Sequence, residues 1–275
     1  MLLPRISIVT PSFNQASFLE EAMESVLSQG YPSLDYQVLD GGSTDGSAEL
    51  IRQRAPRLSH WRSGRDAGQS AALREGFARA TGDVLGWINS DDALEPGALS
   101  AVGEAFARHP EADIVHGDLR FIDRAGRRLF DGHVVLGLGI LAYDAPYVGQ
   151  PAMFWRRSIY EKVGGLDPAY RFAMDFDLVI RMLAAGARGL KLRRGLARFR
   201  LHPAAKTSTL QATCDAEVAR TLQAHGLAQE APAVVFAKRW TFRALRFARD
   251  PRCVVSAVES RLRTRRDASG FSARR

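Results

Sequence analysis

Three short polar clusters each follow an apolar run of the sequence, namely Pro11–Asn14, Asp40–Asp45 and Asn89–Asp92. Carboxylates that converge on one pocket repel each other unless a cation or hydrogen-bond donors keep them ionised. A Mg²⁺ or Mn²⁺ ion held by one or two carboxylates and by phosphate oxygens is a common arrangement of this kind. Asp91 and Asp92 are therefore candidates for a cation site that serves a diphosphate. The alternative, which applies more to Asp92, is that these acids cap the helix expected to follow them.

The pattern around the clusters predicts how they meet. Strand-like runs alternate with helical patterns, with strands expected at residues 6–10, 36–39, 58–62 and 84–88 and helices at 16–29, 47–54, 69–80 and 96–109. Such alternation predicts βαβ units and a parallel, doubly wound α/β sheet. Because ligands in open α/β sheets bind beyond the carboxyl ends of the strands, the three clusters are expected to form one site.

The second half of the chain is less regular. Short strands are expected at residues 114–116 and 119–122, and helices at 157–163 and 175–185. The expected domains are a first domain over residues 1–210, a helical extension over 211–263 and a disordered tail over 264–275. Within the first domain, residues 1–110 form one expected half, which carries the three clusters, and residues 111–210 form the other.

The composition is typical of a folded globular protein, with 275 residues, 46% of them hydrophobic and 25% charged. Two cysteines, Cys214 and Cys253, are too few for a disulfide framework or a cysteine-based zinc cluster. The N-terminal residues do not resemble a signal peptide, and the longest apolar run, Val134–Tyr143, is about half as long as a membrane span. A cytoplasmic location is therefore expected.

The net charge of +8 is concentrated at the C-terminus, where residues 231–275 contain 12 Lys and Arg against 3 Asp and Glu. A helix is expected between Ala233 and Arg249, with an apolar half that includes Trp240 and a basic half that includes Arg243. Such a helix is typical of peripheral attachment to an anionic membrane surface, here the inner face of the plasma membrane. The alternative is that its apolar half packs on the protein. Nucleic acid is not an expected partner, because no nucleic-acid-binding module accompanies the tail.

Seven motifs follow one another along the chain, namely Thr10–Asn14, Asp40–Gly46, Arg65–Ser70, Gly82–Asp92, Gly164–Asp167, Met174–Leu178 and Arg200–Lys206. In this order and spacing they resemble the motifs of family 2 glycosyltransferases of the GT-A fold. The resemblance implies a Rossmann-like, mostly parallel sheet flanked by helices, followed here by the amphipathic C-terminal helix. It also implies an inverting enzyme that transfers a sugar from a UDP, dTDP or GDP donor to a glycan or lipid-linked acceptor.

The resemblance assigns expected roles to individual residues. The implied nucleotide-sugar-binding residues are Pro11, Asn14, Asp40, Asp66, Gln69, Asn89 and Asp91. Asp91 matches the metal-binding acid of the family's Asp-x-Asp motif, and the expected cofactor is Mn²⁺ or Mg²⁺. His202 is implied as a further metal ligand or phosphate donor, and Lys206 as part of a lid over the diphosphate. The alternative for His202 is an ordinary surface histidine.

Two positions depart from the family pattern. Asn89 replaces the first acid of the Asp-x-Asp motif, so the cation is expected to be held mainly by Asp91 and the diphosphate. Met174 stands where many relatives have Glu, which leaves Asp175 as the candidate base. Inversion requires such a base on the acceptor side and positive charge at the leaving diphosphate. The alternative for Asp175 is a helix cap.

The resulting hypothesis is a metal-assisted glycosyltransferase of cell-envelope or surface glycan synthesis. One alternative is a catalytically degenerate GT-A domain that acts as a membrane-associated binding subunit. Another is a sugar-nucleotide nucleotidyltransferase, but that activity would require a glycine-rich basic loop after the first strand, where Pro11–Asn14 stands.

Overall fold

The computed structural model describes residues 2–259, except for the side chains of residues 207 and 208. The expected disordered tail at 264–275 and the last residues of the expected extension at 211–263 lie outside this part of the chain.

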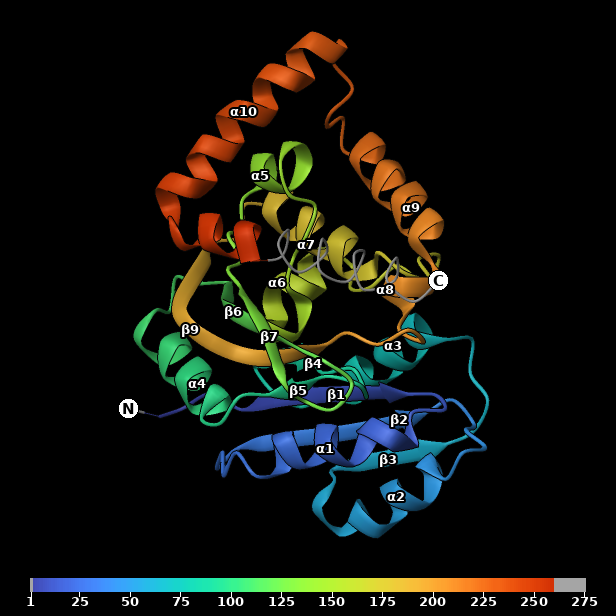
Figure 1. The fold of residues 1–275 in the computed structure, drawn as a ribbon. Helices are drawn as coiled ribbons and strands as arrows, with labels where there is room; N and C mark the ends of the chain where they lie inside the picture. The colour runs from blue at the N-terminus through green and yellow to red at the C-terminus, as the bar shows by residue number, and fades with distance from the viewer. Residues whose placement is uncertain (1, 260–275) are drawn as a thin grey trace.

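One nine-stranded sheet forms the centre of the molecule (Figure 1). Its spatial order is β3-β2-β1-β4-β8-β6-β9-β5, and β7 pairs with β6. The strands are β1 (Ile6–Ser12), β2 (Leu34–Asp40), β3 (His60–Ser63), β4 (Val84–Trp87), β5 (Ala93–Leu94), β6 (Ile114–Ile122), β7 (Arg128–Gly132), β8 (Met153–Arg156) and β9 (Gly189–Arg200).

The first four strands are parallel, with β2 and β4 on either side of β1 and β3 beyond β2. This confirms the predicted βαβ units. From β4 onward the sheet is mixed, because β8 is antiparallel to both β4 and β6, and β9 is parallel to β6 but antiparallel to β5. The predicted strands at 114–116 and 119–122 are one strand, β6. The long strand β9 has no predicted counterpart, and its five basic residues hide the alternation expected of a strand.

Helices cover both faces of the sheet (Figure 1). They are α1 (Ala16–Leu27), α2 (Ser47–Arg54), α3 (Gln69–Arg79), α4 (Ala98–Arg108), α5 (Leu138–Tyr143), α6 (Arg157–Lys162), α7 (Met174–Ala184), α8 (Lys206–Thr209), α9 (Gln211–Ala224) and α10 (Pro232–Arg249), with 3₁₀ turns η1 (Ala55–Arg57) and η2 (Gln150–Ala152). Apolar residues of α1, α2 and α4 pack with Ile8 on one face, and those of α3, α6 and α7 pack with Val9 on the other. Neighbouring residues of β1 thus serve opposite faces, as the period of a strand requires.

The C-terminal helices α9 and α10 form an arch beside α5 and α7 (Figure 1). The ring of Phe242 in α10 stacks on Tyr143, with ring centroids 5.5 Å apart. Arg243 and Arg246 bind the two carboxylate oxygens of the buried Asp144 at 2.8 and 2.6 Å. The basic half of α10 therefore faces the protein.

Most of the apolar half of α10 faces outward. The side chains of Phe236 and Trp240 are 61% and 54% exposed, whereas Phe247 packs with Phe242 against Val135, Ile140 and Cys253. The helix therefore packs on the domain mainly through its basic half, because the buried Asp144 requires cationic partners. No helix among residues 2–259 combines the length and apolar character that a membrane crossing demands.

Candidate functional site

The carboxyl ends of the parallel strands bring the three polar clusters together, as predicted. Ser12 at the end of β1 pairs in register with Asp40 at the end of β2, and Asp40 pairs with Ser63 at the end of β3. Val9 pairs with Trp87, the last residue of β4, so the cluster that begins at Asn89 emerges at the same edge. Because the adjoining helices cover the two faces of the sheet, this edge is where polar side chains gather.

A cavity of about 770 Å³ lies at this edge. Its lining includes the predicted residues Pro11, Asp66, Gln69, Asn89, Asp91, Asp175 and Lys206. Residues separated by more than a hundred positions in the chain therefore share one cavity. Its volume is in the range typical of pockets for cofactors and small ligands.

Asp40 and Asn14 lie outside the cavity lining and hold the turn between them. The carboxylate of the fully buried Asp40 accepts hydrogen bonds from Gly42 N at 3.1 Å and Ser63 Oγ at 2.6 Å. Asn14 has a positive φ of 53°, and its Oδ1 atom accepts a hydrogen bond from Thr44 N at 3.0 Å. Asn tolerates this left-handed backbone better than most residues. Both side chains thus fix the turn after β2 that borders the cavity.

A chain of side-chain hydrogen bonds crosses the cavity. Lys206 Nζ donates to Gln69 Oε1 at 2.5 Å, and Gln69 Nε2 donates to Asn89 Oδ1 at 2.7 Å. Burial lowers the pKa of Lys206, whereas the charge of Asp91 opposes that shift. Lys206 is thus tied to Gln69 at the start of α3 and, through it, to Asn89 after β4.

The carboxylate of Asp92 is buried next to Asn89. Its Oδ1 atom accepts a hydrogen bond from Arg200 N at 3.0 Å, and its Oδ2 atom accepts one from Asn89 Nδ2 at 3.2 Å. Burial and the neighbouring charge of Asp91 raise the pKa of Asp92 well above its usual range. These bonds join β9 to the loop after β4, so Asp92 supports the site rather than capping α4.

Asp91 and His202 meet, although 111 positions separate them in the sequence. The Nε2 atom of His202 lies 3.1 Å from Oδ2 of Asp91, and His202 is 7% exposed. A carboxylate oxygen beside an imidazole nitrogen suits Mn²⁺, which accepts both kinds of ligand. Asp91 lines the cavity, whereas His202 lies outside the lining. The two side chains together fit a divalent cation.

Asp175 is the second residue of α7 and lines the same cavity. Burial raises its pKa to about 6, although hydrogen bonds from backbone N–H groups, including that of Phe176 at 2.8 Å, oppose the shift. A carboxylate with this pKa accepts a proton more readily than an ordinary aspartate does. Asp175 thus has both the position and the pKa of a general base.

The sequence argument missed several residues of the cavity. Phe13 and Tyr147 line it with aromatic rings that are 61% and 43% exposed. Phe13 stands inside the first polar cluster and could have been noted there, whereas Tyr147 lies in an irregular loop without a signal. Gln211, Cys214 and Val218 of α9 also line the cavity, which makes this helix part of the site.

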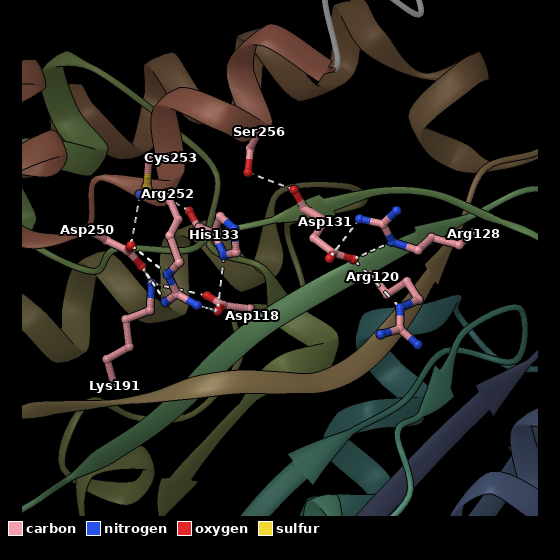
Figure 2. A network of polar contacts seen from close by, with 10 residues as sticks. All are labelled: Asp118, Arg120, Arg128, Asp131, His133, Lys191, Asp250, Arg252, Cys253 and Ser256. Atoms are coloured by element: carbon pink, nitrogen blue, oxygen red, sulfur yellow. Dashed lines mark hydrogen bonds and ion pairs between the residues drawn. The ribbon is translucent and has the colours of Figure 1, made fainter.

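A second group of ionisable residues lies outside the cavity lining (Figure 2). Single ligand atoms of Asp118, His133 and Asp250 lie within 4.8 Å of one another, as in a metal site. Lys191 Nζ, however, lies 3.1 Å from Asp118 and also pairs with Asp250, and Arg252 binds the same two acids at 2.9 and 2.8 Å. Two cations therefore already balance these two carboxylates, and the group ties the segment after α10 to β6 and β9.

Residues 7–164 match the family model described as glycosyl transferase family 2. An uncharacterized glycosyltransferase of Nostoc sp. is 31% identical over 215 residues, which are 73% of this chain and 66% of that protein. The O-antigen biosynthesis protein RfbC of Myxococcus xanthus is 32% identical over 187 residues, which are 66% of this chain and 15% of that protein. The chain thus spans less than two thirds of the length of these two relatives.

Solved structures share the fold at low sequence identity. S. aureus TarS 1-349 in complex with UDP-GlcNAc has a TM-score of 0.62 at 14% identity, covering 89% of this chain and 73% of that chain. The mannosyltransferase PcManGT from Pyrobaculum calidifontis, in complex with GDP-Man and Mn²⁺, has a TM-score of 0.58 at 17% identity, covering 94% and 85%. The fold is therefore that of GT-A-type transferases. With the family match over more than half of its length, the chain belongs to glycosyl transferase family 2.

Proposed function

We propose that this enzyme transfers a sugar, with inversion, from a nucleotide-diphosphate donor to an acceptor hydroxyl. The observation that carries the proposal is that Asp175 and Asp91 line one cavity. Asp175, with a pKa raised to about 6, takes the proton of the attacking hydroxyl as the new glycosidic bond forms. The bond between the sugar and the diphosphate breaks in the same displacement, and the diphosphate leaves on the opposite side of the sugar.

Charge at the leaving group is supplied from the other side of the cavity. Asp91 and His202 would hold a Mn²⁺ or Mg²⁺ ion, which neutralises the charge that develops on the diphosphate. Lys206 contributes a further positive charge, and Gln69 orients it through a hydrogen bond of 2.5 Å. The exposed aromatic ring of Phe13 in the cavity lining offers a stacking surface for the donor's base.

The donor class follows from the structural relatives, whose complexes contain UDP-GlcNAc in one case and GDP-Man with Mn²⁺ in another. A UDP, dTDP or GDP sugar is accordingly the proposed donor. The O-antigen relative supports a glycan or lipid-linked acceptor in cell-envelope or surface polysaccharide synthesis. The proposed location is the cytoplasm, where such donors are available. The outward apolar face of α10 supports peripheral attachment to the membrane.

We assign a bilayer surface to that face of α10 on grounds of charge as well as apolar exposure. No acidic residue occurs between Pro232 and Arg249 in this helix. Arg239 and Arg249 are exposed, although each donates a hydrogen bond at 3.4 Å to a backbone carbonyl, Tyr143 O and Leu136 O respectively, so their charge can still act on anionic headgroups. Phe236 and Trp240 contact each other with ring centroids 6.3 Å apart and form the aromatic centre of the face.

The test is transfer and hydrolysis of UDP-, dTDP- and GDP-sugars with Mn²⁺ or Mg²⁺. Asp175→Asn and Asp91→Ala are each expected to lower kcat by at least about 100-fold. Glu104→Gln, an exposed position on α4, is the control and keeps full activity. Full turnover in both site variants contradicts the assignment. Donor binding without turnover on any acceptor would instead support the degenerate binding subunit.

A further inference from the structure

Three consecutive backbone N–H groups just before α7 converge on one side chain. Glu217, on α9, accepts hydrogen bonds from Arg171 N at 2.8 Å, Phe172 N at 2.9 Å and Ala173 N at 2.8 Å. The two segments are more than forty residues apart in the chain. Asp175 follows Ala173 by two positions, so the carboxylate of Glu217 holds the backbone that leads directly to the proposed base.

Glu217 binds the N-cap N–H group of α7, that of Ala173, and the N–H groups of the two residues before it. The first N–H groups of a helix have no partners within the helix, and Ala173 at the N-cap offers no side-chain acceptor. Glu217 is only 8% exposed. Burial by itself would raise its pKa, but the hydrogen bonds from the three backbone N–H groups outweigh this effect and lower the pKa. The carboxylate therefore stays ionised, where the dipole of α7 also favours a negative charge.

A second contact from α9 fixes the same loop. Tyr170 OH lies 2.7 Å from Oγ1 of Thr221, which is fully buried one turn after Glu217. From the opposite side, Ser70 Oγ of α3 donates to Tyr170 O at 2.6 Å. The loop is thus held between α9 and α3, and the start of α7 has a single defined position relative to the cavity.

We propose that Glu217 is a positioning residue, which sets the orientation of Asp175 by holding the N–H groups of residues 171–173. This inference rests on the proposed function, because it takes Asp175 to be the base. Glu217 itself does not line the cavity. A base displaced by about 1 Å loses on the order of 100-fold in rate, so even a small relaxation of this loop is costly.

The test compares Glu217→Gln with Glu161→Gln, which alters an exposed glutamate on α6. Gln keeps the size of Glu, but an NH₂ donor group replaces one of the two carboxylate oxygens. Because that group cannot accept a hydrogen bond from a backbone N–H group, at least one of the three bonds is lost. In Glu217→Gln, kcat is expected to fall by about 10- to 100-fold, with KM for the donor and Kd for the nucleotide within twofold of the unmodified enzyme. Glu161→Gln leaves all three constants unchanged.

Amide hydrogen exchange gives a readout that does not depend on activity. Peptides that contain residues 171–173 are expected to exchange faster in Glu217→Gln, while peptides of β1 and β4 keep their protection. If Glu217→Gln does not fold, Tyr170→Phe provides the second variant, because it removes only the hydroxyl that contacts Thr221. We expect the same pattern of lower kcat, constant KM and faster exchange in that variant, with smaller changes.

An unchanged kcat, or a KM that rises in parallel with the fall in kcat, overturns the positioning role. A different result would contradict the proposed function itself. In that case Asp175→Asn retains turnover, whatever the behaviour of Glu217→Gln.

Discussion

The side chain of Asn89 donates a hydrogen bond from Nδ2 to the buried Oδ2 atom of Asp92 over 3.2 Å. This contact explains why an amide stands at the first position of the Asp-x-Asp motif. A carboxylate at Asn89 would face that of Asp92, whose pKa is already raised by burial and by Asp91. The hydrogen bond from Asn89 thus gives a local structural reason for the missing acid.

Asn89→Asp is expected to destabilise the protein at neutral and alkaline pH. Two adjacent carboxylates disfavour their charged forms, so the variant should lose about 1–3 kcal/mol of unfolding free energy at pH 8. The loss should shrink at pH 5, where one of the two acids binds a proton. Urea unfolding at both pH values measures this. Asn89→Ala, which adds no charge, should show a loss that changes little with pH, and an equal pH response in the two variants would contradict the explanation.

The raised pKa of Asp175 predicts how activity depends on pH. Because the base must be ionised, kcat/KM should rise with pH and level off above a midpoint of about 6. A pH profile measured with saturating Mn²⁺ tests this, and a midpoint near 4 would show that the carboxyl group is not desolvated as the structure has it.

The raised pKa of Asp175 also affects the stability of the folded protein. A pKa raised from 3.8 to about 6 means that the folded state binds this proton more tightly than the unfolded state. The carboxyl group of Asp175 therefore contributes its full stabilisation of the folded state below pH 3.8. This contribution is lost as the pH rises through 6. Asp175→Asn should therefore raise the free energy of unfolding by about 1–3 kcal/mol at pH 8. Thermal or urea unfolding should show no such gain at low pH.

Two histidines allow the proposed cation site to be separated from the second ionisable group. His202→Ala should weaken Mn²⁺ binding by at least about tenfold, because it removes a ligand beside Asp91. His133→Ala should leave Mn²⁺ affinity unchanged, because Lys191 and Arg252 already neutralise the acids around His133. Titration of Mn²⁺ by calorimetry or electron paramagnetic resonance measures both, and the reverse pattern would place the ion at the second group.

The outward apolar face of α10 predicts binding to lipid. The full chain should float with vesicles of phosphatidylcholine and phosphatidylglycerol, and Trp240 fluorescence should shift to the blue on binding. Phe236→Ser combined with Trp240→Ser should abolish flotation, whereas Thr241→Ser, also exposed on α10, should not. If the chain does not float with vesicles but dimerises through this face, as measured by light scattering, the membrane assignment is contradicted.

The sequence alone determined the parallel half of the sheet and the place of the site. Strand-like runs alternate with helical patterns up to residue 109, and three of the four runs end in a polar cluster. These signals are local, because a period of 2 or 3.6 and the residue that ends it are read within about ten positions. The motifs then named Asp66, Gln69, Asp91 and Asp175, which line one cavity.

The tertiary structure decided how the other half pairs and which side chains meet. β9 carries too many basic residues for its strand character to be read locally, yet it pairs with β6 and brings His202 to Asp91. The spacing of residues 233–249 predicts an apolar half and a basic half of α10. It does not predict which half faces inward, because that depends on the buried Asp144, almost a hundred residues earlier in the chain. The contact of Glu217 with the backbone N–H groups of residues 171–173 also joins segments that are far apart in the chain. Partners far apart in the chain come together only through packing, and no periodicity in the sequence encodes their contact.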